Sequence, residues 1–119
     1  WKFMATVKQE VEKHMDDTTF NVDVLCGLLN MSRTSFYNKI KALTAQAPAD
    51  YIRLIRLKHA TKLLSEQKYS ISEIADMTGF SDAKYFREVF KKHFNVSPSQ
   101  YAKGNKTNTN NDNKPSVEQ

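Results

Sequence analysis

The chain has 119 residues, a formal net charge of +5 and a sequence isoelectric point near 9.3. This length suits one compact domain, and the excess of positive charge favours a polyanionic partner. The single cysteine, Cys26, excludes an internal disulfide, and no apolar run approaches the length of a membrane span. We therefore expect a cytoplasmic domain without membrane contact of its own. Because the sequence begins with Trp1 rather than Met, we expect a piece of a longer protein.

The first expected element is a packing helix at residues 1–17, which makes residues 1–19 an N-terminal segment. Its apolar residues form one stripe at three- and four-residue steps: Phe3, Val7, Val11 and His14 with Met15. Residues 1–17 hold three lysines and four acidic residues, so this segment contributes nothing to the positive charge. The run Asp16-Asp17-Thr18-Thr19 predicts the break that follows the helix.

Residues 20–48 have the pattern of a helix-turn-helix unit. Asn21 suits the N-cap of a first short helix, and Asn30 suits the left-handed conformation of the turn. Met31 is expected to fill the turn, and Ser32 to cap the second helix. The residues that this second helix would turn inward are Phe36, Ile40 and Leu43. Those left outside are Arg33, Thr34, Tyr37, Asn38 and Lys41.

Residues 49–66 predict one long helix, with Pro48 in its first turn. Its apolar face is broad and consists of Ile52, Ile55, Leu57, Ala60, Leu63 and Leu64. A helix of this length spans roughly 25 Å, so it can hold two units at a fixed separation. Two interpretations stay open for Arg53 and Arg56: they clamp phosphate groups, or they form ion pairs on the helix surface.

Residues 67–102 contain a second helix-turn-helix unit and a closing helix. Ser70 and Glu73 form a capping box, Gly79 supplies the left-handed turn, Phe80 fills it, and Ser81 is expected to cap the next helix. The residues expected to face inward are Tyr85, Phe86, Val89, Phe90 and Phe94. The outer face is polar and mostly basic: Lys84, Arg87, Glu88, Lys91 and Lys92.

The end of the chain divides into a short helix and a polar tail. Ser97 followed by Pro98 predicts a capped closing helix that carries Tyr101. Residues 103–119 consist mainly of Asn, Thr, Lys and Ser, with Val117 as the apolar exception. Since such a segment cannot bury enough apolar surface to fold, we expect disorder there.

The two helix-turn-helix units are an internal repeat. The run Asn30-Met31-Ser32 matches Gly79-Phe80-Ser81, the pair Phe36 and Ile40 matches Phe86 and Phe90, and both copies end in Pro-x-x-Tyr. The second copy has one extra residue near Asp82-Ala83. Residues 33–92 hold twelve Lys or Arg against six Asp or Glu, so the positive charge lies on the repeated body of the fold. A repeated, capped turn with a basic second helix favours DNA binding over an ordinary helical hairpin.

The remaining polar residues give no pattern for catalysis or cofactor binding. His14, His59 and His93 lack a second ligand at metal spacing, and we expect no metal and no cofactor. Cys26 takes the place of Ala75 in the repeat, which predicts a small core residue. There is no pair of carboxylates, no glycine-rich phosphate loop and no nucleophile beside a base, so an enzyme is not expected.

Over roughly residues 5–103, the sequence resembles the tandem DNA-binding domain of the AraC/XylS family of bacterial transcription regulators. The matching positions include Ile71, Ile74, Ala75, Gly79, Phe80, Asp82, Tyr85, Phe86, Phe90, Lys91, Lys92, Phe94, Ser97, Pro98 and Tyr101. The segments at residues 31–34, 39–44 and 52–57 are similar to one branch, the C-terminal output domain of Bacteroides-type hybrid two-component sensors. The resemblance implies an all-α fold of seven helices in which the third and sixth are recognition helices.

The resemblance also implies site residues, carried over by motif position. Those expected to read bases are Arg33, Thr34, Tyr37, Asn38, Ala83, Lys84, Arg87 and Glu88. Those expected to contact phosphates are Lys41, Arg53, Lys91 and Lys92, together with Ser32 and Ser81 at helix N-termini. The sequence departs from the family pattern at Arg87 and Glu88, at Asn30, Ala45 and Asn95 where Gly is usual, and at Ala102.

The family further implies double-stranded DNA as the partner, a homodimer in the full-length protein, and contact with RNA polymerase. In the full-length protein an upstream sensor or receiver would control the domain, and the fragment would be attached to a membrane sensor. Two alternatives come from other classes: a helical adaptor whose basic face binds an acidic protein, and a non-specific nucleic-acid binder. A preference among DNA sequences separates the family interpretation from both.

Overall fold

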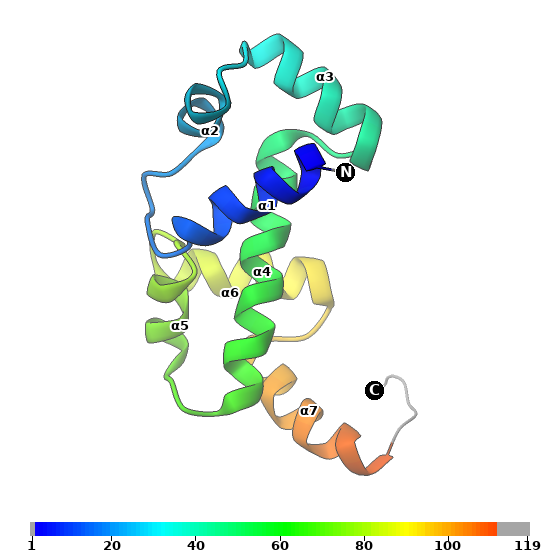
Figure 1. The fold of residues 1–119 in the computed structure, drawn as a ribbon. Helices are drawn as coiled ribbons and strands as arrows, with labels where there is room; N and C mark the ends of the chain where they lie inside the picture. The colour runs from blue at the N-terminus through cyan, green and yellow to red at the C-terminus, as the bar shows by residue number, and fades with distance from the viewer. Residues whose placement is uncertain (1, 112–119) are drawn as a thin grey trace.

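The computed structural model describes residues 2–111, and within them the fold consists of α-helices without strands (Figure 1). The predicted all-α class and the seven implied helices are therefore confirmed. The helices are α1 (Lys2–Lys13), α2 (Val22–Leu29), α3 (Arg33–Thr44), α4 (Pro48–Glu66), α5 (Ile71–Met77), α6 (Ala83–Phe94) and α7 (Pro98–Asn111). None of the described helices is both long enough and apolar enough to cross a membrane.

Two separate hydrophobic clusters hold the helices, and α4 runs through both of them. The first cluster joins α1, α2 and α3 to the N-terminal half of α4, with Val7, Leu25, Phe36 and Ile40 almost completely buried. The second joins α5, α6 and α7 to the C-terminal half of α4, around Phe86 and Phe90. Figure 1 shows α4 as the central rod with one unit at each end. The predicted connecting role of this helix is confirmed, and its 19 residues span about 28 Å.

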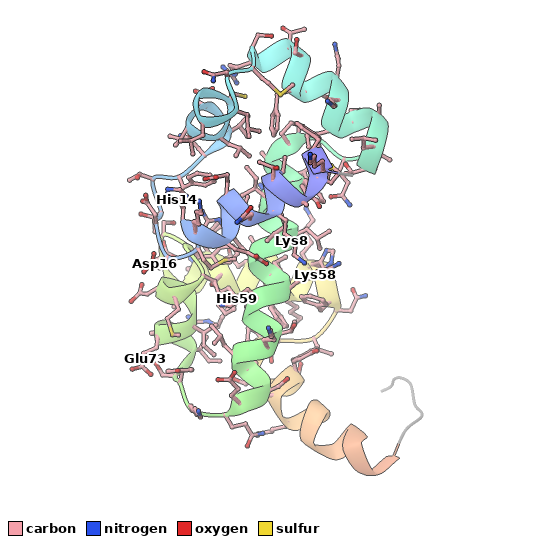
Figure 2. The ribbon with its side chains drawn as sticks, in the orientation of Figure 1. Lys8, His14, Asp16, Lys58, His59 and Glu73 are labelled. Atoms are coloured by element: carbon pink, nitrogen blue, oxygen red, sulfur yellow. The ribbon has the colours of Figure 1, made fainter. Side chains whose placement is uncertain are left out.

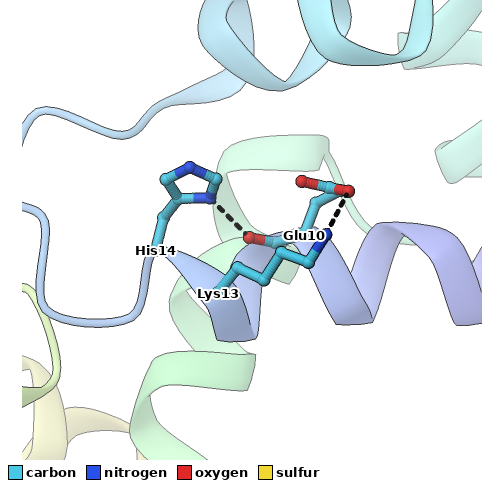
Figure 3. A network of polar contacts seen from close by, with 3 residues as sticks. All are labelled: Glu10, Lys13 and His14. Carbon is cyan, nitrogen blue, oxygen red and sulfur yellow. Dashed lines mark hydrogen bonds and ion pairs between the residues drawn. The ribbon is translucent and has the colours of Figure 1, made fainter.

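Helix α1 ends at Lys13, four residues earlier than the sequence predicted, because the chain turns sharply after it. Asp17 Oδ1 accepts hydrogen bonds from Thr19 N at 2.8 Å and from Thr19 Oγ1 at 2.6 Å, which closes a tight turn. These bonds lower the pKa of Asp17. The Nδ1 atom of His14 lies 2.9 Å from Glu10 O, and Lys13 forms an ion pair with Glu10 (Figure 3). The His14 ring also stacks on Phe20 at 4.5 Å, so this histidine has a structural role.

Most predicted caps are confirmed. Asn21 and Ser32 accept hydrogen bonds from Val24 N and Ser35 N, and the capping box of Ser70 and Glu73 is complete. The left-handed residues include Asn30, with φ of 56°, and Gly79, with φ of 80°. Phe80 is 4% exposed and fills its turn as expected. The equivalence of Cys26 and Ala75 is confirmed too, since both lie in the core, and burial raises the pKa of the Cys26 thiol.

Two sequence predictions about the core residues of these helices were wrong. Leu43 is 42% exposed and Tyr85 is 40% exposed, although both were expected to face inward. Leu43 and Tyr85 each lie at the edge of the apolar stripe of their helix. Because successive residues of a helix are rotated by about 100°, these edge positions are turned partly toward solvent. Helix α7 is drawn to Asn111, and the expected disorder of residues 103–119 stays a prediction. Residues 112–119 of that expected tail lie outside the described residues.

Ala45 adopts a backbone conformation that glycine would adopt more easily. It ends α3 with φ of 63° and ψ of 11°, and its N–H donates to Lys41 O at 2.8 Å. Ala45→Gly removes the Cβ strain of this conformation, so we expect stabilisation by about 0.5–1 kcal/mol in urea denaturation. Ala42→Gly is the matched control, because Ala42 is an exposed helical residue of α3, and it should destabilise by about 1 kcal/mol. Equal destabilisation by both changes would contradict the assignment of strain to Ala45.

Candidate nucleic-acid interface

Helices α3 and α6 present the same outward positions in the same register. Both have 12 residues, and each residue of α3 has its counterpart 50 positions later in α6. The outward pairs are Arg33 and Ala83, Thr34 and Lys84, Tyr37 and Arg87, Asn38 and Glu88, and Lys41 and Lys91. Ala83 is half-buried and the other nine are exposed. Within each helix these residues recur at three- and four-residue steps, so they lie on one face. The buried residues Phe36 of α3 and Phe86 of α6 lie on the other side of their helices.

Three shallow hollows run from the outward face of α3, past the start of α4, to the side of α6 that faces α4. The first lies between α3 and the start of α4 and is lined by Arg33, Thr34, Tyr37 and Asn38. The second shares Val22 and Ala49 with the first and extends to Arg53 and Tyr85. The third continues from Arg53 and Tyr85 along α6 to Lys92. The structure thus brings Arg53 and Lys92 together on one strip, with the predicted base-reading residues of α3 at one end. The predicted base-reading residues of α6 do not line this strip.

Arg53 lies at the centre of this strip as a half-exposed cation. Its Nη1 donates to Asp50 Oδ1 at 2.8 Å, and 37% of its side chain is exposed. Burial alone would lower the pKa of Arg53, but hydrogen bonds to Asp50 and Tyr85 outweigh it and raise the pKa. The side chain therefore stays charged at any physiological pH. Helix-surface ion pairs at three- or four-residue spacing contribute only about 0.2–0.5 kcal/mol, so a phosphate can compete with Asp50.

Arg56 has a different environment, and both sequence interpretations of it were wrong. Only 6% of this residue is exposed, and its guanidinium donates to backbone carbonyls rather than to carboxylates. The nearest acceptors are Met15 O at 2.6 Å and Thr78 O at 2.9 Å. Burial lowers the pKa of Arg56, although Asp17 and Asp16 counteract this. A buried guanidinium whose two terminal nitrogens already donate to carbonyls cannot clamp a phosphate or pair with a surface acid.

The N-terminus of α6 also differs from the prediction. Asp82, not Ser81, is the N-cap, and its Oδ1 accepts a hydrogen bond from Tyr85 N at 2.7 Å. A carboxylate is a strong cap because it also interacts favourably with the helix dipole. The extra residue of the second copy is therefore Ser81, which lies between Phe80 and the cap. The equal spacing of Ser32 to Phe36 and Asp82 to Phe86 was the signal that could have found this.

The first recognition helix keeps its predicted cap but holds one reading residue in an ion pair. Ser32 Oγ accepts from Ser35 N at 3.1 Å. Arg33 Nε lies 3.0 Å from Asp23 Oδ1, and both side chains are mostly exposed. In α6, by contrast, neither Arg87 nor Glu88 takes part in an ion pair within the described residues. The cationic side chains of α6 are thus available to a ligand without first breaking a contact.

Two capped helix-turn-helix units whose second helices present exposed faces that carry cations define a tandem helix-turn-helix protein. Residues 25–104 match the family model described as a helix-turn-helix domain, which is more than half of the chain. The chain belongs to the AraC-type family of helix-turn-helix DNA-binding domains, as the sequence resemblance indicated. It is a sequence-specific DNA-binding domain of a bacterial transcription regulator.

Particular relatives agree with this family. Histidine kinase P4 of Formosa agariphila is 45% identical over 91 residues, which are 76% of this chain and 7% of the kinase. The chain spans about a third or less of the length of the curated relatives it matches. The C-terminal domain of the two-component response regulator YesN from Fusobacterium nucleatum superposes with a TM-score of 0.78. It is 27% identical, and the match covers 86% of this chain and 99% of that domain.

A further solved structure contains nucleic acid. The DNA-binding domain of the global transcription factor AdpA, in complex with a target DNA, matches with a TM-score of 0.78 and 28% identity. The match covers 87% of this chain and 92% of the AdpA domain. Other relatives are named as transcription regulators, among them the Msm operon regulatory protein of Streptococcus mutans and the transcriptional activator RhaS of Escherichia coli.

Proposed function

We propose that α3 and α6 enter two successive major grooves on one face of a DNA duplex. The observation that carries this proposal is the identical register of their outward residues on two units that α4 joins. The longest dimension of the molecule is 46 Å, and successive major grooves on one face of B-DNA are about 34 Å apart. The molecule as a whole is therefore longer than the distance between the two grooves. The DNA-bound AdpA domain, which has the same fold, supports this use of it.

Each recognition helix would read bases with the set of residues implied by the family motif. In α6, Lys84 and Arg87 are suited to the N7 and O6 acceptors of guanine, while Ala83 can meet a thymine methyl group and Glu88 can accept from cytosine N4. In α3, Arg33 would have to exchange Asp23 for a base, Asn38 is suited to adenine, and Thr34 and Tyr37 complete the face.

Phosphate contacts would supply most of the affinity. The cations proposed for this role are Lys41, Arg53, Lys91 and Lys92, and the N-terminus of α3 at Ser32 can add backbone N–H donors. Ser81 would contribute through its exposed hydroxyl alone. The N-terminus of α6 is not a good anion site, because the carboxylate of Asp82 already caps it and would repel a phosphate.

The test is selection from a pool of random duplexes followed by sequencing of the bound fraction. We expect a bipartite site with its halves about one helical turn apart. Lys84→Ala and Arg87→Ala should each cost about 1–3 kcal/mol on that site and relax the preference in one half only. Lys8→Ala is the control: Lys8 lies on α1, which crosses in front of α4 in the view where α6 passes behind it (Figure 2). Enrichment of no sequence would favour a protein adaptor or a non-specific binder.

In the full-length protein we propose that this chain is the non-catalytic output domain of a two-component system in the bacterial cytoplasm. The similarity to a small part of a histidine kinase and to a response-regulator domain supports this assignment. An upstream sensor would bring two copies together as a homodimer on DNA, and RNA polymerase would be the protein partner. Sedimentation of the full-length protein with and without its DNA site tests dimerisation.

A further inference from the structure

Arg56 lies at the boundary between the two hydrophobic clusters. Immediately before it, Ile52 and Ile55 belong to the cluster of the first unit. Immediately after it, Leu57 begins the series of α4 residues that belong to the cluster of the second unit. Within the described part of the chain, no buried residue belongs to both clusters, and α4 is the one helix that contributes buried residues to each. The orientation of one unit relative to the other therefore depends on the contacts made around Arg56.

The guanidinium of Arg56 binds both units at once. On the first unit its acceptors are Met15 O at 2.6 Å, Asp17 O at 3.2 Å and, more weakly, Phe20 O at 3.5 Å. On the second unit its acceptor is Thr78 O at 2.9 Å, which the same Nη1 atom contacts. Because the guanidinium is planar and its donors have fixed directions, these carbonyls must keep one arrangement around it.

The segments that Arg56 connects lead directly into the recognition helices. Residues 14–20 enter α2, which packs on α3, and Asn21 is the cap of α2. Thr78 ends α5, and only four residues separate it from the first residue of α6. A shift of either segment therefore moves a recognition helix. Thr78 is itself completely buried, and its hydroxyl donates to Ile74 O at 2.7 Å, so its carbonyl is held rigidly.

We propose that Arg56 is a positioning residue that sets the separation and angle of α3 and α6, and thereby the preferred spacing of the two DNA half-sites. This inference rests on the proposed function. Arg56 acts through the backbone of both units and does not touch DNA. Sequence preference within each half-site comes from the recognition helices, whereas preference for the distance between the halves comes from this buried contact.

Two substitutions at Arg56 and one elsewhere separate this role from ordinary stability. Arg56→Lys keeps a charge but loses the planar fork, and Arg56→Met keeps much of the volume but loses every donor. Leu63→Ala is the control, since Leu63 is buried in the second cluster more than one helical turn beyond the boundary. It should lower stability without altering the arrangement of the two units.

The first measurement is the affinity for duplexes that carry both selected half-sites with the distance between them varied in steps of one base pair. The wild type should prefer one spacing by on the order of tenfold, as expected for linked contacts that fit one geometry. Arg56→Lys and Arg56→Met should flatten this profile while keeping the preference within each half-site, and Leu63→Ala should keep the wild-type profile. If Arg56→Lys folds and keeps the wild-type spacing profile, the positioning role of Arg56 is overturned, while the proposed DNA binding stands.

The second measurement needs no DNA. Spin labels at Ala42→Cys in α3 and Glu88→Cys in α6, in a Cys26→Ala background, report the distance between the recognition helices. Arg56→Met should broaden or shift that distance, and Leu63→Ala should not. An unchanged distance would contradict the positioning role. If the wild type selects no DNA sequence, the proposed function fails, while the label distances still decide whether Arg56 places the two helices.

Discussion

Gly79→Ala should lower the free energy of unfolding by at least about 3 kcal/mol, because two independent penalties coincide at this residue. Gly79 has φ of 80°, a conformation in which a Cβ atom is strained. An added Cβ would also overlap Nη1 of Arg56 and lie 2.6 Å from Met15 O. The methyl group can be accommodated only if the guanidinium leaves its buried carbonyls, which would then lose charge-assisted hydrogen bonds. Urea denaturation measures the loss.

The chain offers a matched control in Gly27. This residue lies within α2, and an added Cβ there would meet no atom within 4 Å. Gly27→Ala should therefore stabilise the protein by about 0.5–1 kcal/mol through the better helix propensity of alanine. If Gly79→Ala costs no more than about 1 kcal/mol, only the backbone strain is present, and the close packing against Arg56 would be disproved.

Raising the salt concentration from 50 to 200 mM should weaken DNA binding by roughly two orders of magnitude, because the affinity is proposed to come mainly from four cations at phosphates. These are Lys41, Arg53, Lys91 and Lys92. Each releases a counterion and contributes about 0.9 to the slope of log affinity against log salt, which gives a slope of about −3.6. Fluorescence anisotropy on the selected site at several salt concentrations measures this slope.

Single variants show which cations contribute. Lys92→Ala should reduce the magnitude of the slope by about one, as expected for a side chain that loses one phosphate contact. Lys8→Ala should leave the slope unchanged, since Lys8 lines a separate hollow between α1 and α4. A slope near zero for the wild type would contradict binding through phosphates and favour a protein partner for the basic face.

The repeated sequence predicted the architecture well because each signal was local and strong. The capping box at Ser70, the left-handed turns at Asn30 and Gly79, and the buried pair Phe86 and Phe90 all depend on residues within one or two turns of each other. Such signals act through backbone geometry and helical periodicity, which the sequence displays directly.

The predictions that failed depended on contacts distant in sequence or on competition between neighbours. Arg56 resembles any exposed basic residue of a helix, yet its acceptors are 22 and 41 residues away. Ser81 and Asp82 both suit an N-cap, and only the helix register decides between them. The roles of the proposed base-reading residues remain predictions, since they depend on contacts with the bases of a DNA molecule.

The shared helix α4 also constrains how the distance between the two units could change. Inserting one residue into α4 would advance the second unit by about 1.5 Å but rotate it by about 100°. Seven inserted residues would nearly restore its facing and add about 10.5 Å. Over that distance the DNA itself turns by about 100°, so the displaced helix would meet the wrong side of the duplex. Protein and DNA helices have incommensurate periods, and a new spacing is therefore more accessible through the boundary at Arg56 than through a longer α4.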